Sequence, residues 1–213
     1  MKDREPIVNP KNVDYLVNNF TVFKDIYNQH GAPPNWNRKE GFETLVLIIL
    51  EQQVSLPSAK AHFLKLRDYV GNITPENLLK LTDEEFRENH ISRQKTSYIK
   101  GLADAVLQNE LQLDKLSNLT EDEVREQLTK LKGIGNWTAN VYLLSCLQFK
   151  DIFPIGDLAL VNAIRELTSL QTKEEILEFS KNWKPYRSLA TYFFWHHYLS
   201  KKGKTLETID ILK

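Results

Sequence analysis

Apolar residues recur along most of the chain at the three- and four-residue spacing that places them on one face of a helix. Two segments show this spacing plainly: Tyr98, Ile99, Leu102 and Val106, and then Val124, Leu128 and Leu131. Neither an alternating apolar–polar series nor an Asn-Gly hairpin dipeptide, which are typical of strands and their turns, occurs in the sequence. The pattern therefore predicts an all-α fold.

Helix starts are marked by threonines followed three residues later by glutamate. In such a capping box, the hydroxyl and the carboxylate each accept a hydrogen bond from an otherwise unsatisfied amide. The pattern occurs at Thr82–Glu85, Thr120–Glu123 and Thr172–Glu175, and Thr74-Pro75 predicts a fourth start of a related kind.

The most apolar run, Leu45 to Leu50, has the composition of a buried strand or of a buried helix. It continues without a helix breaker through Glu51, Gln52, Gln53 and Val54, which favours a buried helix over this whole segment. The run is far shorter than the roughly 20 apolar residues that a membrane-spanning helix needs. No membrane segment is expected.

Two breaks divide the chain, at Ala32 to Asn35 and at Phe153 to Gly156. We expect one domain made of two helical subdomains, roughly 40–150 and roughly 1–39 plus 151–213, with a cleft between them.

The formal net charge is zero, which argues mildly against a general nucleic-acid binder. Within Ser180 to Lys204, however, all charged residues are basic: Lys181, Lys184, Arg187, Lys201, Lys202 and Lys204. A solvated face and a phosphate-facing surface both explain this stretch.

Cysteine and histidine offer no pattern typical of a metal site. A single cysteine, Cys146, cannot form an internal disulfide or hold an iron–sulfur cluster. The five histidines have no metal-ligand spacing. The charged N-terminus lacks the apolar stretch of a secretory signal. We therefore expect a cytoplasmic protein, nucleoid-associated if bacterial.

The sequence Gly133-Ile134-Gly135 joins a helix that begins near Glu121 to another that runs toward Gln148. Glycines permit positive φ and close backbone approach. The amides of such a hairpin and the N-terminus of its second helix can bind a phosphate oxygen. A helix-ending turn without a ligand is an equally good interpretation of these residues alone.

Asp157 follows the break at Phe153 to Gly156 and precedes an apolar helical run. Taken alone, an aspartate at this place is more often an N-cap than a catalyst. Together, the hairpin and this aspartate resemble the helix–hairpin–helix DNA glycosylase superfamily, and more specifically its 3-methyladenine DNA glycosylase II family. The resemblance runs from about Phe42 to Leu199, and five segments carry it in order: Ile49 to Ser55, Ser92 to Lys95, Gly133 to Asn140, Pro154 to Ala159, and Trp183 to Arg187.

The resemblance implies a role for several residues. It makes Asp157 the catalytic carboxylate and Gln53 the wedge that fills the place of a flipped base. An exposed amide at the end of a helix is an equally good interpretation of Gln53, because Gln52 competes for the wedge role. It gives DNA contacts to Gly133, Ile134, Gly135, Asn136 and Thr138, with a monovalent cation, Na⁺ or K⁺, on the carbonyls of Thr129, Leu131 and Ile134. Aromatic rings attract a cationic base, so Trp137, Tyr142 and Trp195 are candidates for the base pocket.

The resemblance implies a monomeric, cofactor-free enzyme that acts on double-stranded DNA with a damaged base. It flips out a base such as 3-methyladenine or 7-methylguanine and hydrolyses its N-glycosidic bond. Members that also cut the strand carry a lysine at the position of Trp137, and tryptophan cannot form their Schiff base. We therefore expect no lyase activity. Two alternatives stay open: a glycosylase for deaminated, oxidised or mismatched bases, and a non-enzymatic protein that binds DNA structure.

Overall fold

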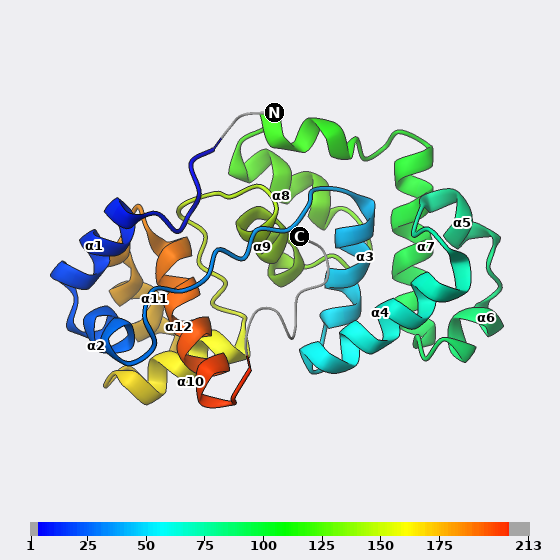
Figure 1. Cartoon of the computed structure of the whole chain (residues 1–213). Helices are drawn as coiled ribbons and strands as arrows, with labels where there is room; N and C mark the ends of the chain where they lie inside the picture. The colour runs from blue at the N-terminus through cyan, green and yellow to red at the C-terminus, as the bar shows by residue number, and fades with distance from the viewer. Residues whose placement is uncertain (1–3, 205–213) are drawn as a thin grey trace. The chain divides into compact units, whose positions relative to one another are not determined.

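The computed structural model describes residues 4–204, and every regular element among them is a helix (Figure 1). The all-α prediction is confirmed for this part of the chain. The described residues form two compact units, one of residues 38–142 and the other of residues 4–37 together with 143–204. None of the described helices is both long and apolar enough to cross a membrane.

The first unit surrounds an apolar helix, α3 (Phe42–Glu51), in which Leu45 to Leu50 are each at most 1% exposed. This confirms that the apolar run forms a buried helix. Helix α3 packs against α4 and α7, and α7 packs also against α5 and α6. The other elements that begin in this unit are α4 (Leu56–Val70), α5 (Pro75–Lys80), α6 (Asp83–Glu88), α7 (Arg93–Leu107), η1 (Leu113–Asn118), α8 (Glu121–Thr129) and α9 (Asn136–Ser145).

The second unit packs α12 (Arg187–Lys201) against α1 (Pro10–Asn19), α2 (Thr21–His30) and α10 (Leu158–Leu167). Helix α11 (Lys173–Ser180) and the short η2 (Lys181–Trp183) complete it. Phe23 of α2 lies at the centre, with its ring centroid 5.4 Å from that of Trp183 and 5.3 Å from that of Phe193. These rings are fully buried and supply much of the unit's apolar core.

The local signals for helix starts are confirmed. All three capping boxes are present with both of their hydrogen bonds, at Thr82, Thr120 and Thr172. Thr74 caps α5 by accepting a hydrogen bond from the amide of Asn77. Each cap contributes about 1 kcal/mol to the stability of its helix, and together they fix where α5, α6, α8 and α11 begin.

Candidate functional site

A tight turn joins α8 to α9, as the glycine pattern predicts. The amide of Ile134 donates to the carbonyl of Leu131 at 3.0 Å and closes the turn. Gly133 has φ +89°, and a Cβ there would lie 2.1 Å from Cγ of the Tyr98 ring. Gly133 therefore needs to be glycine for its conformation and for the close approach of Tyr98. Gly135 has neither requirement, because its φ is not left-handed and nothing lies within 4 Å of its Cβ position.

The start of α9 is the exposed part of the hairpin. Gly135 and Asn136 are exposed, and the carbonyl of Gly135 accepts the first hydrogen bond of α9 from Ala139 at 3.0 Å. The amides of a helix's first turn lack partners within the helix and carry the positive end of its dipole. This end of α9 is thus suited to an anion.

Two of the residues predicted to contact DNA through the hairpin backbone have buried side chains. Ile134 is 3% exposed and Thr138 is 1% exposed. Oγ of Thr138 accepts a hydrogen bond of 3.0 Å from Nε2 of Gln52, which also donates to the carbonyl of Gly133 at 2.8 Å. Burial argues against direct contact of either side chain with DNA. The position of Thr138 suits it to hold Gln52 against the hairpin, a relationship that the sequence did not reveal.

Helix α3 ends at Glu51, so the prediction of a helix through Val54 is wrong. Gln52 is extended, with ψ 125°, and its side chain is bonded to the hairpin. Gln53 follows with φ +58° and is exposed. Residues other than glycine adopt positive φ rarely and at some cost, and they do so most often at turns and functional sites. The tertiary contacts of Gln52 thus replace the next helical turn.

Two charged side chains hold the end of α3. Arg38 forms a bidentate ion pair with Glu51, with nitrogen–oxygen distances of 2.7 and 2.9 Å, and both side chains are at least nine-tenths buried. The ammonium of Lys95 donates to the carbonyl of Leu50 at 2.7 Å. Burial lowers the pKa of Lys95. Both contacts fix the backbone immediately before Gln52 and Gln53.

Asp157 lies in the second unit, at the N-cap of α10. Its Oδ1 accepts a hydrogen bond of 2.8 Å from the amide of Leu160 and another of 3.1 Å from Nε1 of Trp195. The side chain is half-buried. The N-cap interpretation of Asp157 is confirmed, and the same geometry holds the carboxylate in one orientation at the positive end of a helix.

Trp195, a predicted pocket residue, is part of an aromatic cluster beside Asp157. Its ring stacks on Tyr192 with centroids 6.0 Å apart and meets the edge of Trp36 at 6.2 Å. Trp195 is half-buried, whereas Trp36 is 7% exposed and Tyr192 is fully buried. Trp36 was missed in the sequence, where the only signal was a tryptophan outside any helical repeat, shortly after Pro33-Pro34.

The other two predicted pocket residues lie in the first unit. Tyr142 is fully buried, and its hydroxyl accepts a hydrogen bond of 3.0 Å from the amide of Gly41. This position is that of a core residue and argues against contact with a base. Trp137 is half-buried in the first turn of α9.

The described residues contain no group of three or more histidines, cysteines and carboxylates suited to a metal ion. Three histidines nevertheless gather in the second unit. Nε2 of His30 lies 3.3 Å from Nδ1 of His197, and Nε2 of His196 lies 3.0 Å from the carbonyl of His30. Burial and the two neighbouring rings lower the pKa of His30. The wide sequence separation concealed this cluster.

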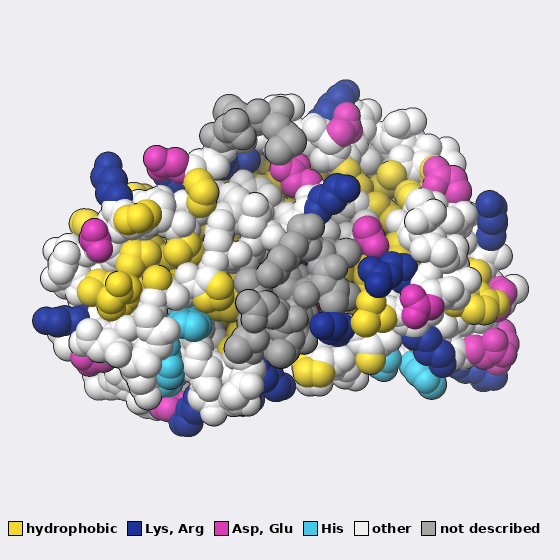
Figure 2. Space-filling model, viewed as in Figure 1, with side chains coloured by type: hydrophobic (Ala, Val, Ile, Leu, Met, Phe, Trp, Pro, Cys, Tyr) yellow, Lys and Arg dark blue, Asp and Glu magenta, His cyan; other side chains and the backbone are white. Residues whose placement is uncertain are grey.

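The basic stretch after Ser180 is partly neutralised by carboxylates from other segments. Arg187 forms a bidentate ion pair with Asp151, with distances of 2.7 and 2.8 Å, and Lys201 lies 2.6 Å from Glu166. Lys181 pairs with Glu178. Figure 2 likewise shows basic and acidic side chains interspersed on the visible face. The positive charge that this stretch offers to phosphate is therefore smaller than its sequence suggested.

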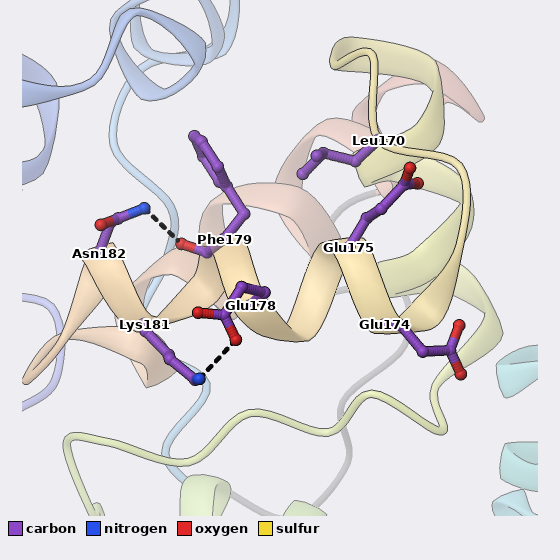
Figure 3. Close-up of a pocket in the computed structure, with 7 residues that line it drawn as sticks. All are labelled: Leu170, Glu174, Glu175, Glu178, Phe179, Lys181 and Asn182. Carbon is purple, nitrogen blue, oxygen red and sulfur yellow. Dashed lines mark hydrogen bonds and ion pairs between the residues drawn. The ribbon is translucent and has the colours of Figure 1, made fainter.

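A hollow on the second unit lies along α11 and does not include any predicted site residue (Figure 3). It is lined by Leu170, Glu174, Glu175, Glu178, Phe179, Lys181 and Asn182. Three glutamates and one lysine give it an acidic rim, which repels phosphate. The hollow is unsuited to the DNA backbone.

Comparison with known proteins agrees with the glycosylase resemblance. A model of the HhH-GPD superfamily of base excision DNA repair proteins matches residues 46–186. The DNA-3-methyladenine glycosylase of Bacillus subtilis is 33% identical over 169 residues, which are 72% of this chain and 56% of that protein's length. A structure of 3-methyladenine DNA glycosylase from Schizosaccharomyces pombe in complex with abasic DNA aligns with a TM-score of 0.80 and 27% identity, covering 87% of this chain and 95% of the other. The 3-methyladenine glycosidase of Bacillus halodurans aligns with a TM-score of 0.74 and 26% identity, covering 93% and 94%.

Proposed function

The chain belongs to the HhH-GPD superfamily of base excision DNA repair proteins, and we propose that it is a monofunctional DNA glycosylase for alkylated, cationic bases. Its substrates would be bases such as 3-methyladenine and 7-methylguanine in double-stranded DNA, and it would act as a monomer. The relatives named 3-methyladenine glycosylases support this substrate class. The chain spans just over half of the length of the B. subtilis protein.

The observation that carries the proposal is the fixed carboxylate of Asp157. Two donors, the amide of Leu160 and Nε1 of Trp195, hold one of its oxygens. Departure of a base leaves an oxocarbenium-like sugar, and a preorganised carboxylate stabilises that positive charge without reorganising. A base that already carries positive charge leaves with little help from an acid. One aspartate is then sufficient, and the ring of Trp195 beside it suits a cationic base.

The hairpin supports the proposed binding of the DNA backbone. The exposed start of α9 at Gly135 and Asn136 would bind phosphate through main-chain amides, which position DNA without reading its sequence. Of the two glutamines, we assign the wedge to Gln53, because it is exposed while Gln52 is bonded to the hairpin. A monovalent cation on the carbonyls of Thr129, Leu131 and Ile134 would assist the grip.

The reaction would need no cofactor and would stop at the abasic site. Trp137 stands where strand-cutting relatives carry their lysine, so the strand would stay intact. The single, buried Cys146 cannot supply the thiolates of an iron–sulfur cluster. Such an enzyme would act in the compartment that contains the DNA, which is the cytoplasm with its nucleoid if the source is bacterial.

The decisive experiment is a base-release assay of the purified protein on a panel of duplexes. The panel holds methylated DNA and duplexes with uracil, hypoxanthine, 8-oxoguanine or a mismatch. We expect release of 3-methyladenine or 7-methylguanine at rates that exceed those of the neutral lesions. Release of a neutral lesion alone would replace the proposed substrate class, and binding without any release would favour a non-enzymatic protein.

A further inference from the structure

The end of α3 and the α8–α9 hairpin are joined by one side chain, that of Gln52. Its Nε2 donates to the carbonyl of Gly133 at 2.8 Å and to Oγ of Thr138 at 3.0 Å. The first contact spans 81 positions of the sequence and ends on the glycine whose φ of +89° shapes the hairpin turn. Both amide hydrogens of Gln52 are therefore used within the first unit.

The peptide that Gln52 contacts is held on both sides. The carbonyl of Gly133 accepts from Gln52, and the amide of the same peptide, that of Ile134, donates to the carbonyl of Leu131 at 3.0 Å. A peptide group bonded at both its oxygen and its nitrogen has little freedom to rotate. Gln52 thus ties the end of α3 to a turn that the bond from Ile134 to Leu131 already closes.

Gln53, the next residue, is held in a left-handed conformation and exposed. The residues before it are fixed independently, Leu50 by the ammonium of Lys95 and Glu51 by Arg38. Gln52 is the last residue held by such a contact before the exposed Gln53. The orientation of Gln53 relative to the hairpin therefore depends on the side chain of Gln52.

We propose that Gln52 is a positioning residue that couples the wedge to the hairpin, so that gripping the backbone and filling the gap left by the base occur as one event. The inference rests on the proposed function, because it needs Gln53 to enter the DNA stack. Without Gln52, the hairpin still binds phosphate, but Gln53 loses its fixed direction and its insertion costs conformational entropy.

The test is a double-mutant cycle with Gln52→Met and Gln53→Ala. Methionine keeps the length of glutamine and removes both donors. Each protein is bound at saturation to a duplex that holds a stable abasic analogue beside 2-aminopurine, whose fluorescence rises when its base is unstacked. The dissociation constant for the same duplex is measured in parallel.

We expect Gln52→Met to remove most of the fluorescence rise and to weaken binding about threefold to tenfold, about the contribution of one neutral hydrogen bond. The double variant should be no worse than Gln53→Ala alone. Thr138→Val, which removes one of the two acceptors and keeps the shape, should give a smaller effect in the same direction. Gln108→Met, at an exposed position, controls for the substitution itself and should match the wild type.

A purely structural role of Gln52 would lower the melting temperature and leave the fluorescence of the saturated complex unchanged. That result would overturn the inference. Additive effects of Gln52→Met and Gln53→Ala on the dissociation constant would also overturn it. So would an unchanged fluorescence in Gln53→Ala, because there would then be no wedge to position. None of these measurements requires base release. If the wild-type protein shows coupling between the two glutamines but releases no base, the proposed activity is refuted and the inference about Gln52 is not.

Discussion

The indole of Trp195 donates a hydrogen bond of 3.1 Å to Oδ1 of Asp157, the same oxygen that accepts from the amide of Leu160. The tryptophan comes from α12 and the aspartate from the start of α10, two helices that pack together in the second unit. The carboxylate proposed as catalyst is thus oriented by tertiary structure as well as by its own helix.

Asp157→Asn tests the charge of the carboxylate. Asparagine caps helices about as well as aspartate, so the variant should fold and bind DNA normally. The electrostatic contribution to base release is lost, and the single-turnover rate should fall by about 100-fold or more. Asp14→Asn, at an exposed position of α1, is the matched control. Near-normal turnover of Asp157→Asn would remove Asp157 from the catalytic role.

Trp195→Phe tests the orientation of the carboxylate. The substitution keeps an aromatic ring but removes the donor to Asp157, and a hydrogen bond to a charged group contributes about 1.5–3 kcal/mol. The single-turnover rate should fall about tenfold to 100-fold if that energy is needed in the transition state.

Trp183→Phe is the control for the loss of an indole. Trp183 is fully buried, and its Nε1 has no hydrogen-bond partner among the described residues. This change should lower stability through the lost volume, without a specific effect on rate in the folded protein. An equal loss of rate in both variants would show that packing, and not the bond to Asp157, accounts for the effect of Trp195→Phe.

Gly133→Ala tests whether the hairpin requires its first glycine. Alanine would be strained at φ +89°, and its Cβ would overlap the Tyr98 ring. We expect a loss of about 1–3 kcal/mol in the free energy of unfolding by urea. Gly135→Ala, with open space at its Cβ position and no left-handed φ, should stay within about 0.5 kcal/mol of the wild type. Equal stability of the two variants would contradict the described turn.

The sequence was informative where the cause of a structure is local. A capping box needs only Thr120 and Glu123, and the N-cap of α10 needs only Asp157 and the helix after it. The end of α3 was predicted wrongly because contacts with the distant Gly133 decide it. Trp36 was missed for the same reason, since its ring meets α12 through tertiary packing. Local patterns predict elements and candidate residues, whereas the partners of those residues depend on the fold.

The absence of a lysine at the position of Trp137 predicts the product of the reaction. A Schiff base with the sugar requires an amine, and tryptophan has none to offer. The strand should remain whole until alkali or a separate lyase cuts it, as denaturing gel electrophoresis would reveal. Borohydride should trap no covalent adduct during turnover. A trapped adduct would instead point to a lysine elsewhere and make the enzyme bifunctional.

The zero net charge of the chain limits how strongly its binding to DNA depends on salt. Each contact between a protein cation and a phosphate adds about 0.9 to the slope of log affinity against log salt. Arg187 and Lys201, from the basic stretch after Ser180, are already paired with carboxylates. Main-chain amides of the hairpin bind phosphate without adding a protein cation. The slope should therefore be modest, equivalent to a few contacts.

Two variants separate the amides of the hairpin from its charge. Gly135→Pro deletes one exposed amide and also restricts Ile134 before it, whereas Lys132→Ala removes an exposed cation. With both variants shown to be folded by circular dichroism, Gly135→Pro should weaken binding more, and Lys132→Ala should lower the salt slope by at most about one contact. If Lys132→Ala abolished binding while a folded Gly135→Pro bound normally, the lysine and not the hairpin backbone would be the grip on DNA.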